Sequence, residues 1–277
     1  MNLLAFDTST DTMSIAVSRG VGGLAQVWQH TGAGGALASS TLIPAIRQLM
    51  QQAGLQFDQL DAIAFGRGPG SFTGLRTACS VAQGLAFGAG VPVLPVDSLL
   101  AVAEEARYQE AMKEPTQEAT QETTQEVVRQ SPGDGAWSPA SWPQAPTSPL
   151  RVLALLDARM DEMYAAKYEF NSGLWLQHDG CSLIRPENLV ESLPGGAGGV
   201  EGPRGLIAGN VFAVFADRLP ACRAPRIHAL PTATAMLRLA PALLAAGQAV
   251  PADQALPTYI RDKVAKTTQE RLVEKAA

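Results

Sequence analysis

The first half of the chain contains Leu3-Leu4-Ala5-Phe6-Asp7, and the second half contains Leu153-Ala154-Leu155-Leu156-Asp157. Each stretch is a short apolar run that ends at an aspartate, which predicts a buried strand followed by a turn. The two stretches are offset by 150 positions, and the same offset relates Met13 to Met163. Two similar units therefore open the two halves, and a duplicated βββαβα lobe is the economical interpretation.

The elements around the first stretch favour an α/β fold. Strands are predicted where apolar residues run or alternate, and helices where they recur every three or four positions. The predicted strands are 3–6, 13–18, 24–29, 61–65 and 91–96, and the predicted helices are 39–53, 75–87 and 98–111. The resulting order is βββαβαβα.

The second half repeats this pattern in a smaller form. Its predicted strands are 151–156, 162–170, 174–184 and 205–208, and its predicted helices are 186–192, 211–217 and 232–246. We expect a first lobe at 1–112, joined by a helix at 232–248, and a second lobe at 150–231. Residues 249–277 form a polar C-terminal tail. The stretch 113–149 carries six prolines and a repeated Thr-Gln-Glu triplet, which indicates a low-complexity insertion.

Composition narrows the class of function. The net charge is −5 and no dense Lys/Arg run occurs, so autonomous nucleic-acid binding is not expected. Three cysteines without a CxxC pair and three histidines without an HxxxH pair predict no metal site. The N-terminus lacks the basic residues of a secretory signal, and no apolar run reaches membrane-spanning length. We therefore expect a cytoplasmic protein.

One glycine-rich stretch is the strongest local motif, and it is neither a phosphate-binding Walker A loop nor a GxSxG elbow. It opens onto a predicted helix, where free N–H groups favour an anion, and two arginines add positive charge. A phosphate or partner site is one interpretation, and a purely structural tight loop is the other. The stretch is Gly66, Arg67, Gly68, Pro69, Gly70, Ser71, Phe72, Thr73, Gly74, Leu75 and Arg76.

Asp7 and Asp157 each end the first strand of a lobe. A carboxylate in this position can hold Mg²⁺ near the phosphates of a nucleotide, or it can hydrogen-bond its own turn. The turn interpretation is favoured for either residue alone. The matched pair indicates descent from an actin-like phosphotransfer fold.

Several motifs together resemble one known family. They are Leu4–Thr10, Ala64–Arg76, Ala82–Ala86, Leu156–Tyr164 and Pro257–Arg261, and they run from the first strand to the tail. In these motifs the chain resembles the TsaB family, also called YeaZ. The resemblance implies an ASKHA fold, with two ribonuclease-H-like lobes as in actin and sugar kinases. Asp7, Thr8, Ser9 and Asp157 would then line a vestigial nucleotide cleft.

The resemblance also implies a function. TsaB-like proteins work with TsaD and TsaE to transfer a threonylcarbamoyl group from threonylcarbamoyl-adenylate to the adenosine beside the anticodon of ANN-decoding tRNAs. It implies that tRNA is contacted only through the complex, and that the subunit forms a homodimer when alone. It implies no tightly bound cofactor on this chain, with ATP or ADP and Mg²⁺ held at the complex.

The catalytic paralogue TsaD shares the fold and is the main competing assignment. TsaD-like proteins carry a His-x-x-x-His metal pair where this chain has Ser98 and Val102, and neither side chain is an imidazole ligand. The glycine-rich adenosine loop of the second lobe is reduced to Ala208-Gly209-Asn210. A non-catalytic activator is therefore expected. The alternative is a free-standing ASKHA enzyme, either an ATP-dependent phosphotransferase or a TsaD-like metal-dependent transferase.

Two helices of the first lobe are candidates for a partner interface. The resemblance implies a helix-mediated contact with TsaD or a second copy. Small residues at Ala78, Ala82 and Ala86 allow close helix approach, and Leu42 and Ile46 share a stripe on the other helix. The competing interpretation is that these faces cover the sheet.

Overall fold

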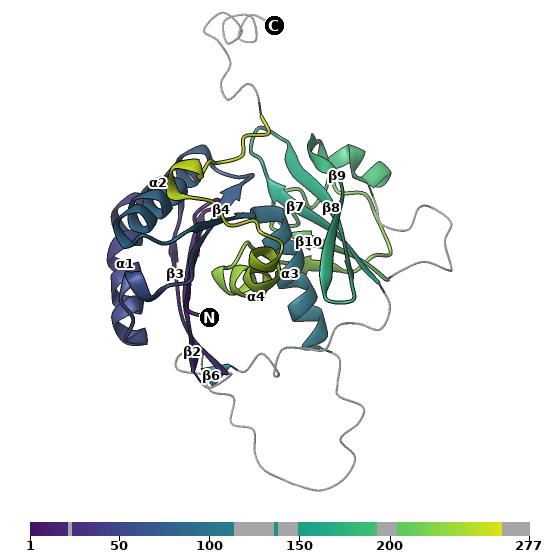
Figure 1. The fold of residues 1–277 in the computed structure, drawn as a ribbon. Helices are drawn as coiled ribbons and strands as arrows, with labels where there is room; N and C mark the ends of the chain where they lie inside the picture. Colours follow the sequence, from purple (N-terminus) through teal and green to yellow (C-terminus); the bar gives the residue numbers. More distant parts are fainter. Residues whose placement is uncertain (22–23, 114–135, 138–148, 193–203, 262–277) are drawn as a thin grey trace, which may run out of the picture.

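A computed structural model describes residues 1–21, 24–113, 136–137, 149–192 and 204–261. It contains two mixed sheets, with helices packed between them and on the outer face of the first (Figure 1). The predicted α/β class is confirmed. None of the described helices is both long enough and apolar enough to cross a bilayer.

The first sheet has the strand order β5-β4-β1-β2-β3-β6. Its strands are β1 (Leu3–Asp7), β2 (Thr12–Val21), β3 (Leu24–Ala33), β4 (Ala62–Gly68), β5 (Val93–Asp97) and β6 (Ala136–Trp137). β1 pairs antiparallel with β2 and parallel with β4. Its Leu4 and Phe6 enter the core on one face, and Leu3 and Ala5 enter the core on the other. Burial on both faces explains why this strand is apolar without alternation.

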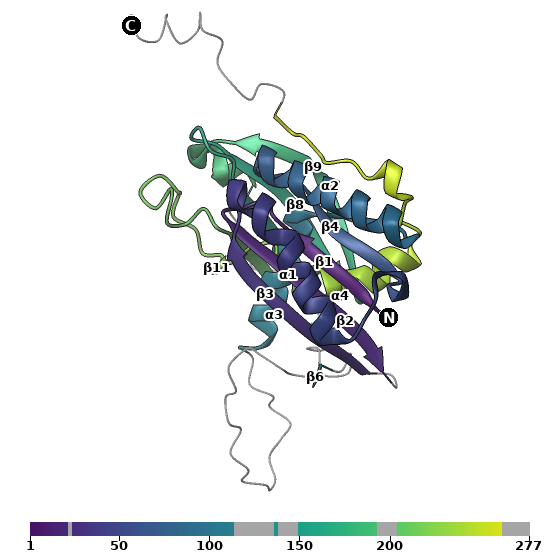
Figure 2. The same cartoon turned by 90° about the vertical axis from the view of Figure 1, so that its left-hand side faces the viewer.

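Helices α1 (Ala38–Ala53) and α2 (Phe72–Ala89) cover the outer face of the first sheet (Figure 2). Each helix ends at a glycine with left-handed backbone: Gly54 has φ 62° and Gly90 has φ 70°. Glycine adopts this conformation at little cost, so these two positions fix where the helices stop.

The second sheet has the order β11-β10-β7-β8-β9. Its strands are β7 (Leu150–Asp157), β8 (Met163–Asn171), β9 (Leu174–Ile184), β10 (Arg204–Gly209) and β11 (Arg226–His228). β7 pairs antiparallel with β8, as β1 does with β2. The register differs by one residue, because Asp7 lies opposite Ser14 whereas Asp157 lies opposite Met163. The second turn is thus one residue shorter than the first.

Helices α3 (Ser98–Ala111) and α4 (Ala233–Ala245) lie between the sheets (Figure 1). α3 buries Leu99 and Val102 in the core of the second sheet. α4 buries Met236 and Leu239 against the first sheet, although it follows the second sheet in sequence. This packing supports the expectation that the helix joins the first lobe, which stays a prediction. The helix continues through Pro241.

The remaining expectations concern one helix, the insertion, the tail and the lobe boundaries. The helix predicted at 211–217 is wrong, because the chain forms turns there, and β11 follows as a strand that the pattern did not indicate. Of the insertion at 113–149, residues 136–137 form β6 and pair with β3; 114–135 and 138–148 lie outside the described residues. Residues 262–277 of the tail also lie outside them. The lobe boundaries at 112 and 150 stay a prediction.

Candidate functional site

A cavity of about 310 Å³ lies where the opening turns of the two halves meet. The first half contributes its β1–β2 turn and part of the glycine-rich stretch. The second half contributes its β7–β8 turn, and the tail crosses the rim. The lining includes Ser9, Thr10, Asp11, Gly70, Ser71, Phe72, Asp157, Arg159, Asn210, Tyr259 and Arg261. We call this cavity the cleft. Of the predicted nucleotide-cleft residues, Ser9 and Asp157 line it, whereas Asp7 and Thr8 lie behind it.

Asp7 is fully buried, with 0% of its surface exposed. Its carboxylate accepts hydrogen bonds from the Ser9 N–H (2.7 Å), the Ser9 hydroxyl (2.6 Å) and the Ser98 hydroxyl (2.9 Å). Burial raises the pKa of Asp7 to about 6, and the hydrogen bonds from Ser9 and Ser98 oppose that shift. A carboxylate enclosed in this way orders its own turn and offers no open ligand position to a metal ion.

Three glycines of the glycine-rich stretch pack directly against this turn. A Cβ atom on any of them would overlap an atom of the turn, and the pairs are Gly66 with Asp7, Gly70 with Ser9 and Gly74 with Thr8. Gly68 has φ 110°, a conformation that favours glycine. The Ser71 N–H also donates to the Ser9 carbonyl (2.7 Å). The close packing of the turn therefore explains these glycines.

The residues of the glycine-rich stretch lie at different sites in the structure. Gly70, Ser71 and Phe72 line the cleft, whereas Arg67 lines a second cavity. Pro69 is buried and Thr73 is exposed. Arg76 donates from Nε to the Tyr259 hydroxyl (3.1 Å), and its guanidinium carbon lies 3.9 Å from the centre of the Phe72 ring. The stretch does not bring both arginines to one anion site.

The β7–β8 turn has an unusual backbone that the sequence did not predict. Arg159, Met160 and Asp161 have φ of 60°, 55° and 60°, all in the left-handed region. Asp157 accepts from the Arg159 N–H (2.8 Å), and the Arg159 side chain reaches Asp11 of the first turn (2.6 Å). Since both carboxylates already face Arg159, the cleft holds no unpaired acidic pair.

The tail connects the two halves across the cleft, and its role was also missed. The Thr258 N–H donates to the Arg67 carbonyl (2.7 Å) on the first half. Arg261 donates to Glu162 (2.6 Å) and to the Arg159 carbonyl (3.2 Å) on the second. A polar tail has no periodicity that predicts such contacts. Among the described residues, no group of three or more His, Cys, Asp or Glu side chains could hold a metal ion.

The five residues proposed for a helix interface lie in the core of the first half. Leu42, Ile46, Ala78, Ala82 and Ala86 are 0–1% exposed and pack toward the sheet. They cannot contact a partner directly, and the interpretation that they cover the sheet is correct for these side chains. The exposed large apolar residues of α1 and α2 are Ile43, Phe72 and Phe87.

Comparisons with known proteins agree with this architecture. The profile of TsaD, described as tRNA N6-adenosine threonylcarbamoyltransferase, matches residues 36–119. The tRNA threonylcarbamoyladenosine biosynthesis protein TsaB of Escherichia coli (strain K12) is 27% identical, with 96% of each chain covered. Its namesake in Haemophilus influenzae is 45% identical over 38% of this chain and 43% of that protein.

Solved structures extend the agreement to three dimensions. YeaZ from Pseudomonas aeruginosa is 33% identical with a TM-score of 0.68, covering 93% of this chain and 99% of that one. A second structure, described as an uncharacterized protein with similarity to peptidase YeaZ from Pseudomonas aeruginosa, is 32% identical with a TM-score of 0.69 and covers 94% and 99%. The chain therefore belongs to the TsaB (YeaZ) family and has its actin-like ASKHA fold.

Proposed function

We propose that this chain is a non-catalytic subunit that works with TsaD and TsaE. The complex transfers the threonylcarbamoyl group from threonylcarbamoyl-adenylate to the adenosine beside the anticodon of ANN-decoding tRNAs. The E. coli and H. influenzae relatives are named as threonylcarbamoyladenosine biosynthesis proteins, which supports the pathway. The net charge of −5 supports tRNA contact through partners rather than through this cytoplasmic chain alone.

The proposed non-catalytic role rests on the two residues at the positions where TsaD-like proteins carry metal-binding histidines. Ser98 is fully buried, and its hydroxyl donates to Asp7 (2.9 Å). Val102 is fully buried in the core of the second sheet. A metal ion needs ligand atoms that face open space. Here one position is closed by a hydrogen bond and the other is apolar, so the free-standing transferase or phosphotransferase is the weaker hypothesis.

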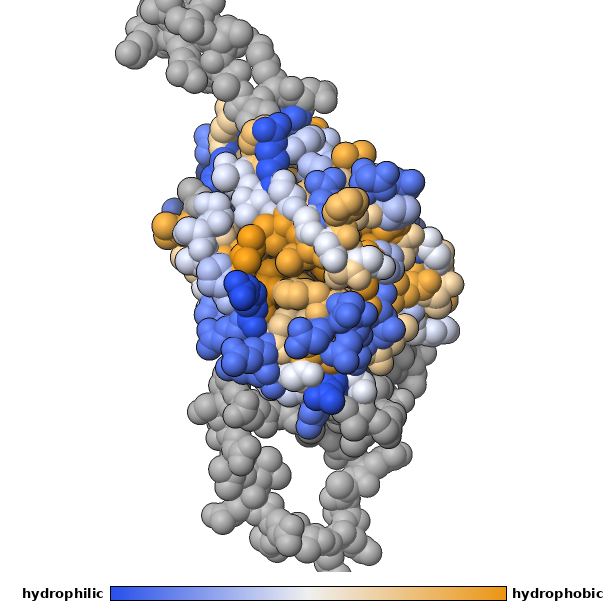
Figure 3. Space-filling view, turned by 60° about the vertical axis from the view of Figure 1, so that its left-hand side comes forward, coloured by the Kyte–Doolittle hydropathy of each residue, from blue (hydrophilic) through white to orange (hydrophobic). Residues whose placement is uncertain are grey.

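The surface of α1 and α2 is the proposed contact for TsaD, or for a second copy when the chain is alone. Hydrophobic residues gather in a hollow on this side of the molecule, with hydrophilic residues around it (Figure 3). The exposed apolar side chains include Leu37 (63%), Ile43 (44%) and Phe87 (84%). Gly84 and Gly88 leave open space on α2, which lets another helix approach closely. We call this surface the α1–α2 face.

The substitution Gly84→Arg tests this contact. No atom lies within 4 Å of a Cβ placed at Gly84, so an arginine fits on the free subunit and raises helix propensity. An opposed helix would meet the long charged side chain. We expect the variant to keep the thermal midpoint of the wild type and to lose co-purification with TsaD.

Gly180→Arg is the matched control, because Gly180 is an exposed glycine on β9 with equally open space. It should bind TsaD as the wild type does. Undiminished binding by Gly84→Arg would place the contact elsewhere.

A further inference from the structure

Arg67 is the charged residue of the glycine-rich stretch that the proposed function leaves unexplained. It lines a second cavity, of about 600 Å³, bounded by α3, α4 and the strands β8 and β9. None of the residues that line the cleft lines this cavity. Its volume lies in the range typical of small-molecule pockets, roughly 300–1,000 Å³.

The second cavity has an aromatic wall and an aliphatic wall, with charged residues between them in its lining. One wall consists of Tyr168, Phe170 and Trp175. The Trp175 ring lies 5.1 Å from the Phe170 ring and 6.3 Å from the Tyr168 ring, centre to centre. Leu239 and Leu243 of α4 also line the cavity. Aromatic and aliphatic walls suit a flat apolar body.

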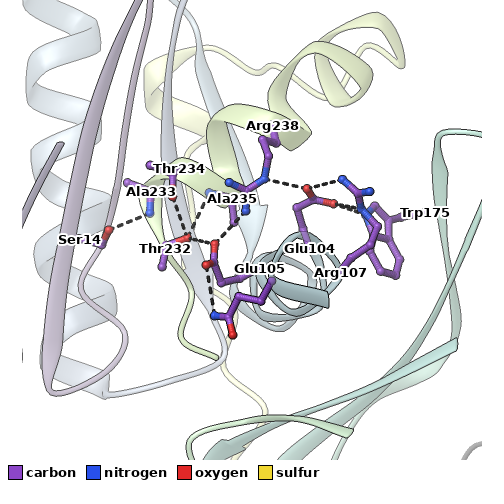
Figure 4. A network of polar contacts seen from close by, with 11 residues as sticks. Ser14, Glu104, Glu105, Arg107, Trp175, Thr232, Ala233, Thr234, Ala235 and Arg238 are labelled. Carbon is purple, nitrogen blue, oxygen red and sulfur yellow. Dashed lines mark hydrogen bonds and ion pairs between the residues drawn. The ribbon is translucent and has the colours of Figure 1, made fainter. Parts of the chain in front are cut away.

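A cluster of buried charged side chains lies at the wall of the second cavity (Figure 4). Glu104 accepts from Arg107 through both of its oxygens (2.8 and 2.9 Å), from Arg238 Nε (2.8 Å) and from the Trp175 indole (3.1 Å). The side chains of Glu104, Arg107 and Arg238 are 3%, 7% and 7% exposed. Arg238 also pairs with Glu105 (2.8 Å), so two carboxylates balance the two arginines and hold the wall and the indole ring in place.

Arg67 differs from these arginines. Among the described residues, none forms a hydrogen bond or ion pair with its guanidinium group. Asp97 attracts Arg67 electrostatically without a hydrogen bond or ion pair between them. Asp97 Oδ1 already accepts from Leu99 N–H (2.8 Å), Leu100 N–H (3.2 Å) and the Tyr168 hydroxyl (3.0 Å). Arg67 lines this cavity and is exposed, and its guanidinium group carries five N–H donors and no acceptor.

We infer that the second cavity binds a compact apolar carboxylic acid, with its carboxylate on Arg67 and its flat body against Trp175. A planar carboxylate matches the fork of a guanidinium. A phosphate, which carries more charge, fits less well because Asp97 and Glu104 line the same cavity. This site goes beyond the proposed function and does not depend on it.

Naphthylacetate, with naphthylethanol as its neutral counterpart, probes the site in the purified full chain. The indole N–H resonance of Trp175, identified by its loss in Trp175→Phe, reports occupancy. We expect the acid to bind about tenfold more tightly than the alcohol, as charge-assisted hydrogen bonds of about 1.5 kcal/mol provide. Arg67→Gln should remove that preference and leave the affinity for the alcohol unchanged.

Ala242→Trp places a large side chain at an exposed position of the cavity lining. Ala245→Trp is the control, because Ala245 is exposed on the same helix and does not line the cavity. The first substitution should abolish the shift of the Trp175 resonance and the second should preserve it. Equal affinity for acid and alcohol, or undiminished binding by Ala242→Trp, overturns the inference.

Discussion

The Asp7 carboxylate has a structural task at the turn after β1. Its carboxylate is closed in by Ser9, Ser98 and the backbone of Gly66, where a side chain would collide with it. Asp157 lies at the equivalent position of the second half, yet it lines the cleft and is 10% exposed. The two aspartates therefore lie in different environments, one enclosed and the other at the cleft.

The raised pKa of Asp7 predicts a pH dependence of stability. The pKa of Asp7 is about 6 in the folded state, against an ordinary value of 3.8 for an aspartate side chain. Between these values the folded state binds a proton that the unfolded state does not bind, so the contribution of Asp7 is fully present below the lower value. It is lost as the pH rises through about 6. Relative to Asp7→Asn, the wild type should lose about 3 kcal/mol of unfolding free energy between pH of about 4 and about 8.

Urea denaturation of both proteins at several pH values measures this difference. Because asparagine does not titrate, every other ionisable group cancels in the comparison. A constant difference across the pH range would show that Asp7 is not the titrating group.

The sequence could predict that residues 7–9 turn, but not that Asp7 would be sealed. Aspartate after a strand is typical of both turns and metal sites. The deciding contacts come from Gly66 and Ser98, which lie 59 and 91 positions away. Likewise, nothing in the residue types of Arg159 and Met160 indicates their left-handed backbone.

At the scale of elements, helices α1 to α4 were predictable from the sequence, and their exposed faces were not. The stripe Ala78, Ala82 and Ala86 was correctly placed on one face of a helix, but small residues suit close packing on a sheet as well as on a partner. Burial assigns the stripe to the sheet and leaves Gly84 and Phe87 outside. Periodicity alone cannot say which apolar face a fold has left uncovered.

The contact between α3 and α4 predicts that removal of one buried charge greatly lowers the free energy of unfolding. Glu104→Gln leaves Arg107, which is 7% exposed, without its carboxylate partner, whereas Arg238 keeps its ion pair with Glu105. Leaving buried charges unpaired costs about 3–5 kcal/mol. Lys113→Ala removes a pair with Glu110 at the same three-residue spacing, but Lys113 is 64% exposed, and such pairs contribute about 1 kcal/mol or less.

Chemical denaturation of both variants compares the two losses. The expected order is a large loss for Glu104→Gln and a small one for Lys113→Ala. Similar losses for both would mean that the buried cluster is not what couples α3 to α4.

At the scale of the whole molecule, the duplicated opening unit made the two-sheet architecture predictable. What the sequence did not show is how the halves are joined. Helix α3 enters the core of the second sheet, helix α4 returns to the first, and the tail spans the cleft from Arg67 to Glu162. These connections hold a cleft whose acidic side chains, Asp11 and Asp157, already face Arg159.

Threonylcarbamoyl incorporation into tRNA is the measurement that tests this account most directly. Purified TsaD, TsaE, tRNA, ATP with Mg²⁺ and threonylcarbamoyl-adenylate are combined with this chain, without it, or with Gly84→Arg in its place. A fourth mixture contains this chain and lacks TsaD. We predict product only with the wild-type chain and TsaD together. Product from this chain without TsaD, or full product when this chain is omitted, would contradict its role as a non-catalytic partner.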